Sequence, residues 1–329
     1  MKRGLIRLDP AELTADELDR RVRVLQARLR AAGVAAALVY GDVSRSGDVA
    51  YLTNLCIYWN EGVLAVPAEG EPAFLTKLSA RVQPWMRATS SVRDLRSGPD
   101  LAGLIGDWLA EAGPGPVGVV ARAWWPAPLL ERFGGREPRD LGDLVRDQRL
   151  GPDESELALL RRAARVAGAA VAAAAAGDGV ARNERLARAE LAGRGSGATD
   201  LLIDCDPGPD GGVALEVRAQ VLDCWALAAR TVPDQPALAT AYGAAVTGLR
   251  AGVSRSRMRG TAPGWHVDVL RHPDLETRGD HRPPEDLDAP FRAGEVAALR
   301  VSGGGPDGGR VVAAGTYVIT EGGIELCAS

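Results

Sequence analysis

A break near residue 151 divides the sequence into two halves with different hydrophobic patterns. Gly151-Pro152 interrupts the chain, and residues 154–176 then repeat leucine and alanine at helical spacing, with small residues on both sides. This pattern predicts one long, tightly packed helix at the start of the second half. A chain of 329 residues is about twice as long as a typical domain. We therefore predict two domains, over residues 1–150 and 151–329.

The first half alternates helical and strand patterns. Thr14, followed three residues later by Glu17, predicts the start of a helix that stops at Gly33. Short apolar runs predict strands at residues 35–40, 49–53, 62–67, 72–75 and 116–120, and a helix is predicted at 101–112. This alternation is typical of an α/β domain.

The second half lacks such regular alternation. After the long helix, the pattern predicts helices at residues 183–192 and 236–249 and strands at 200–205, 219–225, 296–301, 310–316 and 317–326. Residues 255–290 form a polar, irregular segment. Helices and hairpins without a repeated strand–helix–strand unit indicate an α+β domain.

Composition excludes several classes of protein. The chain has 39 Lys and Arg against 43 Asp and Glu, and this net charge of −4 argues against a nucleic-acid-binding protein. No run of eighteen apolar residues predicts a membrane-spanning helix. The four cysteines form no C-x-x-C pair, and Arg7 and Asp9 come too early for a secretory signal. We expect a cytoplasmic protein with reduced thiols.

All three histidines, His266, His272 and His281, fall in one short span of the second half. Histidine is the side chain best suited to exchange protons near neutral pH, so a cluster of this rare residue is a candidate functional site. The alternative for His272 and His281, which flank proline-rich sequence, is a position on the surface.

Several segments carry, in order, a likeness to a known family. They are residues 48–54, 61–67, 154–164, 183–186, 238–253 and 319–326. Together they resemble the pita-bread family of creatinase, prolidase, aminopeptidase P and methionine aminopeptidase. The resemblance implies a creatinase-like α/β N-terminal domain and a shortened α+β pita-bread C-terminal domain. It also implies a homodimer in which the N-terminal domain of one subunit overhangs the partner's site.

Active members of this family hold two divalent ions with two Asp, one His and two Glu. Matching the motifs puts Asp223 at the first Asp position, but Leu227, Arg300 and Ala314 stand where three other carboxylates belong. The histidine position falls in residues 260–266. One carboxylate cannot hold two divalent ions, so the resemblance implies a degenerate metal site, no cofactor and no metallopeptidase activity. Metal catalysis through an unrecognised ligand set is the remaining metal-dependent alternative.

Creatinase is the family precedent for a site without metals, in which a histidine acts as acid and base. By this resemblance His266 is the candidate acid/base, Arg300 the clamp for a substrate carboxylate, and Asp223 the residue that orients His266 or pairs with Arg300. The alternative for Asp223 and Arg300 is a buried ion pair with no catalytic role.

Further residues are candidates for substrate binding. Two adjacent aromatic residues with an amide and an acid form a candidate lid contributed by the partner subunit, and they are equally typical of a dimer interface. These are Tyr58, Trp59, Asn60 and Glu61. Trp265 is a candidate because it lies next to His266 in the sequence. His272 is one by the resemblance, because the family often has a second histidine seven residues after the first, and here the spacing is six.

Two functions follow from these candidates. The first is a metal-independent enzyme that acts on a small amino-acid-derived or carboxylate-bearing molecule by hydrolysis, elimination or cyclisation, as in a step of specialised metabolism. The second is a non-catalytic pseudo-peptidase that keeps the fold as a dimeric binding module. The convergence of His266, Arg300 and Asp223 on a pocket would favour the enzyme, and side chains filling that space would favour the binding module.

Overall fold

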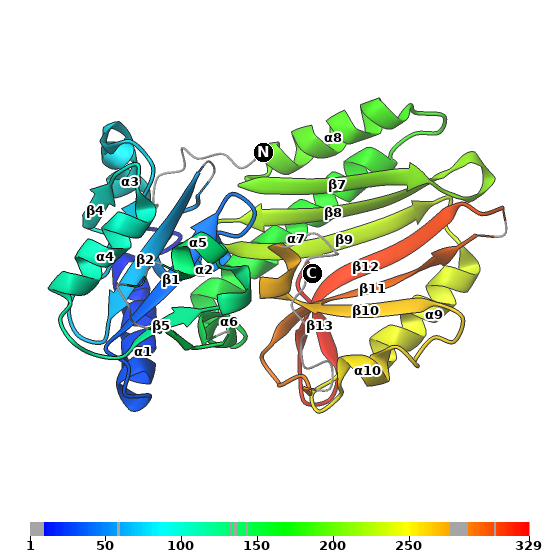
Figure 1. Cartoon of the computed structure of the whole chain (residues 1–329). Coiled ribbons are helices and arrows are strands. Elements are labelled where there is room, and N and C mark those ends of the chain that lie inside the picture. Colours follow the sequence, from blue (N-terminus) through cyan, green and yellow to red (C-terminus); the bar gives the residue numbers. More distant parts are fainter. Residues whose placement is uncertain are drawn as a thin grey trace. The chain divides into compact units, whose positions relative to one another are not determined.

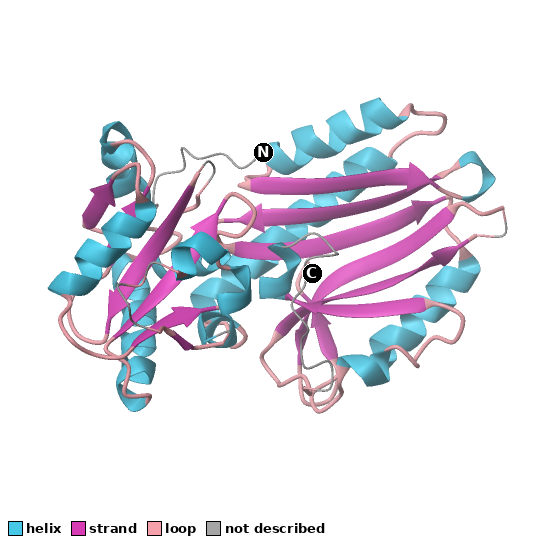
Figure 2. Ribbon diagram, viewed as in Figure 1, coloured by secondary structure: helices cyan, strands magenta, loops and turns pink. Residues whose placement is uncertain are grey.

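The computed structural model describes residues 10–57, 60–131, 133, 137–142, 144–276, 289–305 and 307–328. The chain forms two compact units, Arg3–Arg149 and Leu150–Ser329. Figure 1 shows the elements of each unit in order along the chain, and Figure 2 shows that each unit has its own sheet.

The first unit is built on a mixed six-stranded sheet with the order β4-β3-β2-β1-β5-β6. Its strands are β1 (Ala36–Asp42), β2 (Glu61–Pro67), β3 (Ala73–Thr76), β4 (Asp94–Ser97), β5 (Val117–Val120) and β6 (Arg139–Asp140). Its helices are α1 (Ala15–Ala31), α2 (Gly47–Thr53), α3 (Gln83–Thr89), α4 (Leu101–Glu111), α5 (Ala127–Leu130) and α6 (Leu144–Arg149). Strand pairing is antiparallel between β1 and β2 and parallel between β1 and β5, which fits the predicted α/β class.

Alternation along the central strands places two apolar clusters on opposite faces of this sheet. Leu25 and Leu29 of α1 pack with Val39 on one face, and Ile105 and Trp108 of α4 belong to the cluster on the other. Successive side chains of a strand point to opposite faces, so a central strand that is apolar at every position needs a covering layer on both sides.

The start of α1 is as predicted. The Thr14 hydroxyl accepts a hydrogen bond from the Glu17 backbone N–H at 3.2 Å. The apolar residues at helical spacing face the core, and Gly33 follows the helix with a φ of 62°.

Residues 49–53, predicted as a strand, instead belong to helix α2. The run is short and apolar, and periodicity cannot separate a buried strand from a buried helix at this length. Inside the helix the Thr53 hydroxyl donates to the Val49 carbonyl oxygen at 2.6 Å, a contact between residues four apart. All seven residues of α2 are buried.

The second unit is built on a larger, antiparallel sheet. Its strands are β7 (Asp200–Pro207), β8 (Val213–Val221), β9 (Cys224–Val232), β10 (His266–Arg271), β11 (Val296–Gly304), β12 (Arg310–Ile319) and β13 (Ile324–Leu326). Its α-helices are α7 (Glu154–Ala175), α8 (Arg182–Gly195), α9 (Pro236–Gly248) and α10 (Arg255–Met258). The strand order is β10-β11-β12-β9-β8-β7, with β13 paired to β12.

Helices α7, α8 and α9 lie against the same face of this sheet (Figure 1). Helix α7 begins with a capping box, in which the Asp153 side chain accepts from the Glu156 backbone and the Glu156 side chain accepts from the Asp153 backbone. Its many alanines bring its backbone close to β8 and β9. The long packed helix predicted after residue 151 is therefore confirmed.

Two threonine hydroxyls complete the pairing between β9 and β12. Backbone pairing there is limited to Ala229 and Ala314. The Thr316 hydroxyl accepts from the Leu227 N–H and donates to the Leu227 carbonyl oxygen, and Thr231 does the same with Val312. Hydroxyl groups thus satisfy backbone groups that would otherwise be buried without partners.

Predicted strand 219–225 is wrong in one respect that bears on function. The chain reverses within it, at Leu222 and Asp223, between the paired residues Val221 and Cys224. The prediction missed the turn because Leu222 is apolar, although it adopts a φ of 52°.

No helix in the described part of the chain is long and apolar enough to span a membrane.

Candidate functional site

One row of residues crosses the second sheet from edge to edge. Each member is paired with the next by strand register, and side chains at directly paired positions point to the same face. The row consists of Asp204, Glu216, Ala229, Ala314, Arg300 and Asp268. The alternate residues Val267, Leu299 and Val301 lie on the other face. There they belong to an apolar cluster with Leu238, Ala241 and Ala245 of α9, which we call the α9 cluster. We call the face that carries the row the site face.

The carboxylate of Glu216 is the centre of the charged groups on the site face. Its Oε2 atom lies 3.2 Å from Nε of Arg300 and 2.7 Å from Nη2 of Arg310. Its Oε1 atom lies 3.5 Å from Nη2 of Arg218. The Glu216 side chain is only 2% exposed, and three guanidinium groups compensate for the burial of this carboxylate.

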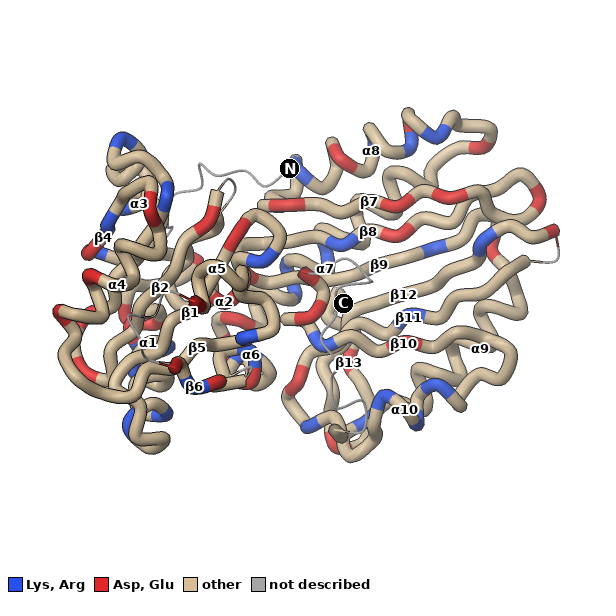
Figure 3. The backbone as a smooth tube through the Cα atoms, viewed as in Figure 1, with Lys and Arg blue, Asp and Glu red and all other residues tan. Residues whose placement is uncertain are grey.

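Arg310 joins two acidic residues. It donates to Glu216 and also pairs with Asp206 at the end of β7. Burial alone would lower the pKa of Arg310, but the hydrogen bond to Asp206 and the charge of Glu216 raise this pKa above its ordinary value. Figure 3 shows the resulting distribution, with acidic segments on β7 and β8 and a basic segment on β11.

Small residues allow Arg300 and Glu216 to meet. Two strands, represented by Ala229 and Ala314, separate their backbones in the row. Three strand spacings amount to about 14 Å, so both side chains must extend toward each other over these alanines. A larger side chain at either alanine would obstruct this path. The Arg300 side chain remains 20% exposed, and its ion pair with Glu216 is its only one among the described residues.

The structure brings two of the three predicted catalytic residues to the site face. His266 is the first residue of β10 and is paired with Ser302, while Asp268 is paired with Arg300. His266 and Arg300 are therefore diagonal neighbours on one face, with Cα atoms about 7–8 Å apart. His266 is exposed, and Asp268 is bound by the buried Arg255 at 3.1 Å.

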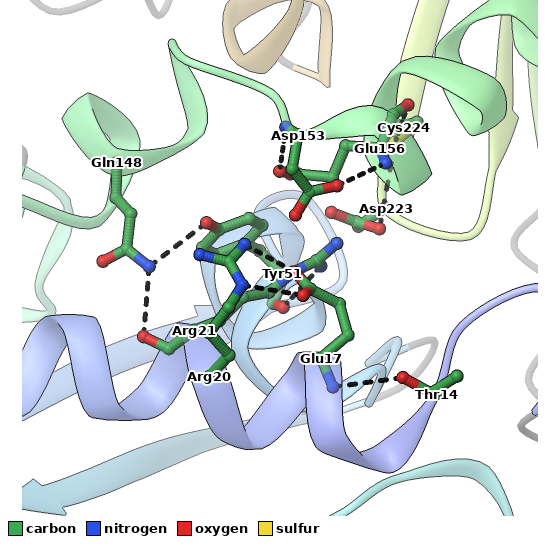
Figure 4. A network of polar contacts seen from close by, with 10 residues as sticks. All are labelled: Thr14, Glu17, Arg20, Arg21, Tyr51, Gln148, Asp153, Glu156, Asp223 and Cys224. Atoms are coloured by element: carbon green, nitrogen blue, oxygen red, sulfur yellow. Dashed lines mark hydrogen bonds and ion pairs between the residues drawn. The ribbon is translucent and has the colours of Figure 1, made fainter.

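Asp223 lies elsewhere. It is in the turn between β8 and β9, six residues along the chain from Ala229, which corresponds to about 20 Å of extended strand. Its Oδ1 atom accepts a weak hydrogen bond from the Cys224 thiol at 3.9 Å (Figure 4). Asp223 therefore neither orients His266 nor pairs with Arg300, contrary to the expectation from the sequence.

The physical reason is the length of the hairpin. Matching the motifs put Asp223 at the first Asp position, but β8 and β9 each have nine residues and are joined by a two-residue turn that contains Asp223. Going along both strands away from that turn, Leu227 is paired with Arg218. The next pair on the site face is Ala229 with Glu216. Glu216, rather than Asp223, is therefore the acid beside Arg300.

The other substrate-binding candidates are scattered. Trp265 packs against the α9 cluster, and a Cβ atom added at Gly303 would lie 3.0 Å from its ring. His272 is buried in the short helix His272–Glu276, so the alternative of a surface position is wrong.

Asn60 and Glu61 belong to the first unit. The Asn60 side chain accepts from the Glu61 backbone N–H at 3.0 Å. The Glu61 carboxylate accepts from Lys77 at 2.6 Å and from the Tyr40 hydroxyl at 2.7 Å. Burial opposes ionisation of Glu61, but these hydrogen bonds are together stronger and lower its pKa. Tyr58, Trp59 and His281 lie outside the described residues.

Sequence reasoning missed Glu216, Arg218 and Arg310. A signal for the first two was present, because they are the two charged residues within the largely apolar run 213–221. Arg310 follows the glycine-rich segment 303–309 and gave no such signal.

The described residues do not fit a pair of divalent ions. No group of three or more His, Cys, Asp or Glu in the described ranges is arranged to hold a metal ion. Glu216 is already bound by guanidinium groups, which would repel a cation at that position. We therefore derive no step through a metal.

Comparison with solved structures identifies the architecture. The chain superimposes on the X-Pro aminopeptidase from Thermotoga maritima with a TM-score of 0.77 and 15% identity, covering 94% of this chain and 97% of that one. The prolidase from Pyrococcus horikoshii gives 0.73 and 17%, covering 94% and 98%. The dipeptidase PepE from Mycobacterium ulcerans gives 0.69 and 19%, covering 98% and 97%.

The chain has the pita-bread fold of the prolidases and aminopeptidases. The fold expected from the sequence motifs is thereby confirmed over nearly the whole chain. No protein-family model and no curated protein sequence matches it. At identities of 13–19% these likenesses concern the fold and leave the chemistry to the residues of this chain.

Proposed function

We propose that this protein is a metal-independent enzyme that binds a small carboxylate-bearing molecule, including amino-acid derivatives, at Arg300. The observation that carries the proposal is the presence of an arginine where the family resemblance implies acidic residues. An arginine, held by a buried glutamate, occupies the part of the sheet where the family resemblance implies metal-binding carboxylates.

Arg300 has the features of a carboxylate receptor. Oε2 of Glu216 lies 3.2 Å from its Nε atom as an ion pair, and the planar guanidinium has two further nitrogens, Nη1 and Nη2. These two nitrogens match the two oxygens of a carboxylate, which gives paired, charge-assisted hydrogen bonds. The partial exposure of the side chain leaves room for a ligand to approach.

His266 is the candidate for proton transfer. It is exposed, on the same face, and diagonal to Arg300, so a substrate whose carboxylate is bound by Arg300 places its neighbouring atoms near the imidazole. Hydrolysis, elimination and cyclisation all require such a proton transfer. The predicted setting also belongs to this proposal: a cytoplasmic homodimer in specialised metabolism, with residues 58–61 of the partner subunit as lid.

Ligand titration tests the carboxylate site. We expect the wild-type protein to bind small carboxylates, measured by calorimetry at low ionic strength. Arg300→Gln should weaken binding about tenfold or more because it removes the charged partner. Arg230→Gln is the matched control, since Arg230 is an exposed arginine paired with Asp234. Equal affinities for all three proteins would contradict the proposal.

A non-catalytic binding module is the second candidate, and one observation favours it. The ion pair of Arg300 and Glu216 extends over Ala229 and Ala314 and occupies part of the site face. A protein that binds carboxylates at Arg300 but turns none of them over in the presence of intact His266 would fit this alternative.

A further inference from the structure

We propose that Glu216 is a specificity-determining residue that restricts the Arg300 site to ligands with a single negative charge. This inference rests on the proposed carboxylate site and names its ligand class: monocarboxylates, to the exclusion of dianions such as sulfate or a phosphate ester. It follows from how the acidic groups are distributed around Arg300.

The first step is the division of the Arg300 guanidinium. Its Nε atom lies 3.2 Å from Oε2 of Glu216, so a carboxylate already lies beside this group. A ligand bound at the remaining nitrogens lies within a few ångströms of that same carboxylate. Each negative charge on the ligand is attracted by Arg300 and repelled by Glu216.

The second step is that Glu216 is fixed in place. Arg310 and Arg218 bind its two oxygens, and Arg310 is itself bound to Asp206. The side chain is 2% exposed, so it has no solvent region into which it could turn when a ligand arrives. The repulsion is therefore part of the site.

The third step is the presence of two more acids on the same side. Asp204 is paired directly with Glu216 across β7 and β8 and is exposed, and Asp206 follows it on the same face. On the opposite side Asp268 faces Arg300 but is paired with Arg255.

The balance of these charged groups explains why the charge of a ligand determines its affinity for the Arg300 site. The guanidiniums of Arg218, Arg300 and Arg310 are balanced by Glu216, Asp206 and Asp204. A monoanion gains two hydrogen bonds from Arg300 against this neutral background. A dianion gains the same number of hydrogen bonds, but its second charge finds no uncompensated cation here, and the cost of removing it from water rises with the square of its charge. Charge therefore acts against the wrong ligand.

The test measures the dissociation constants of propionate, methanesulfonate and sulfate for the wild-type protein and Glu216→Gln by calorimetry or NMR titration. Methanesulfonate has a tetrahedral head like sulfate but one charge, which separates charge from shape. We expect the wild-type protein to bind both monoanions and to bind sulfate about tenfold more weakly. In Glu216→Gln the preference over sulfate should fall about tenfold.

Two further variants keep the test decisive if Glu216→Gln fails to fold. Asp204→Asn, at an exposed position, should shift the preference in the same direction by about threefold. Asp234→Asn, an exposed acid paired with Arg230, is the matched control and should leave it unchanged. A folded Glu216→Gln protein with unchanged preference, or an Asp204→Asn protein identical to the control when Glu216→Gln does not fold, would overturn the inference.

The same data separate this inference from the proposed function. If the wild-type protein binds propionate through Arg300 and the preference survives Glu216→Gln, the carboxylate site stands and the role of Glu216 fails. If the wild-type protein binds none of the three anions, both fail.

Discussion

Arg300 shows how the neighbours of a residue determine what it can do. It lies on β11, next to the edge strand β10, and extends over two alanines to reach a buried glutamate while part of its side chain stays exposed. An unpaired arginine on an open strand would sample many rotamers, whereas the ion pair holds this one in a single direction. This preorganisation lowers the entropic cost of binding a ligand.

Ala314 is the residue that tests this arrangement. Ala314→Leu should obstruct the path between Arg300 and Glu216, and we expect binding of propionate to weaken about tenfold. Ala314→Ser, which adds one atom, is the control and should bind within about twofold of wild type. Calorimetry provides both values. Unchanged binding by a folded Ala314→Leu protein would show that the direction of Arg300 does not depend on this path.

Glu61 gives a prediction about pH at the scale of a single residue. Its pKa is lowered from the ordinary value of 4.5, mainly by the hydrogen bond from Lys77, although burial opposes the shift. A lowered folded-state pKa stabilises the protein above the unfolded pKa and loses this contribution as the pH falls through the folded pKa.

We therefore expect Glu61→Gln to lower the free energy of unfolding at pH 7 by about 0.5 kcal/mol, a small value because Lys77 is well exposed. The difference from wild type should be smaller at pH 3 than at pH 7, because the contribution is lost as the carboxylate is protonated. Urea unfolding at the two pH values measures it. A difference that grows toward acidic pH would contradict the direction of the shift.

At the scale of elements, the junction of β9 and β12 depends on side chains. The Thr316 hydroxyl satisfies both the N–H and the carbonyl oxygen of Leu227 in a buried position. This arrangement joins the strands that carry Glu216 and Arg300 into one sheet, so the geometry of the site depends on it.

Thr316→Val keeps the shape but removes this hydroxyl. Two buried backbone groups lose their partner, and we expect the free energy of unfolding to fall by about 1–3 kcal/mol. Thr240→Val is the control, because Thr240 is exposed on α9 and bonds only within its helix. Urea unfolding distinguishes them. Equal stability of both variants would mean that water replaces the hydroxyl at no cost.

The same scale explains what the sequence could and could not predict. Helices α1 and α7 were predictable because their caps at Thr14 and Asp153 precede long periodic runs. Helix α2 was not, because seven buried residues carry no usable period. The error at Asp223 had a similar origin, since Leu222, which adopts the positive φ in this turn, is not a residue that usually marks turns.

The residues at the family's motif positions could be found from the sequence, whereas the contacts between site residues could not. Arg300 and Ala314 were matched to the family motifs from the sequence, and the structure pairs them directly. The partners of Arg300 could not be found this way, because Glu216 and Arg310 are far from it in sequence and meet it only through strand order. Tertiary pairing of this kind leaves no local pattern.

On the scale of the whole molecule, the charged residues that surround Arg300 on the site face belong to one unit. Asp206, Glu216, Arg300 and Arg310 lie within Leu150–Ser329, which has its own sheet and apolar core. We therefore expect a fragment of residues 150–329 to fold, by circular dichroism, and to bind propionate within about threefold of the full chain. A folded fragment that does not bind would show that residues of the first unit complete the site.

The alanines between Arg300 and Glu216 have a consequence for the design of a metal centre on this sheet. A glutamate introduced at position 314 would lie directly beside Arg300 and would pair with it instead of remaining open to a cation. Such a design would therefore have to replace Arg300 together with the alanines, because no single substitution would create a cation site.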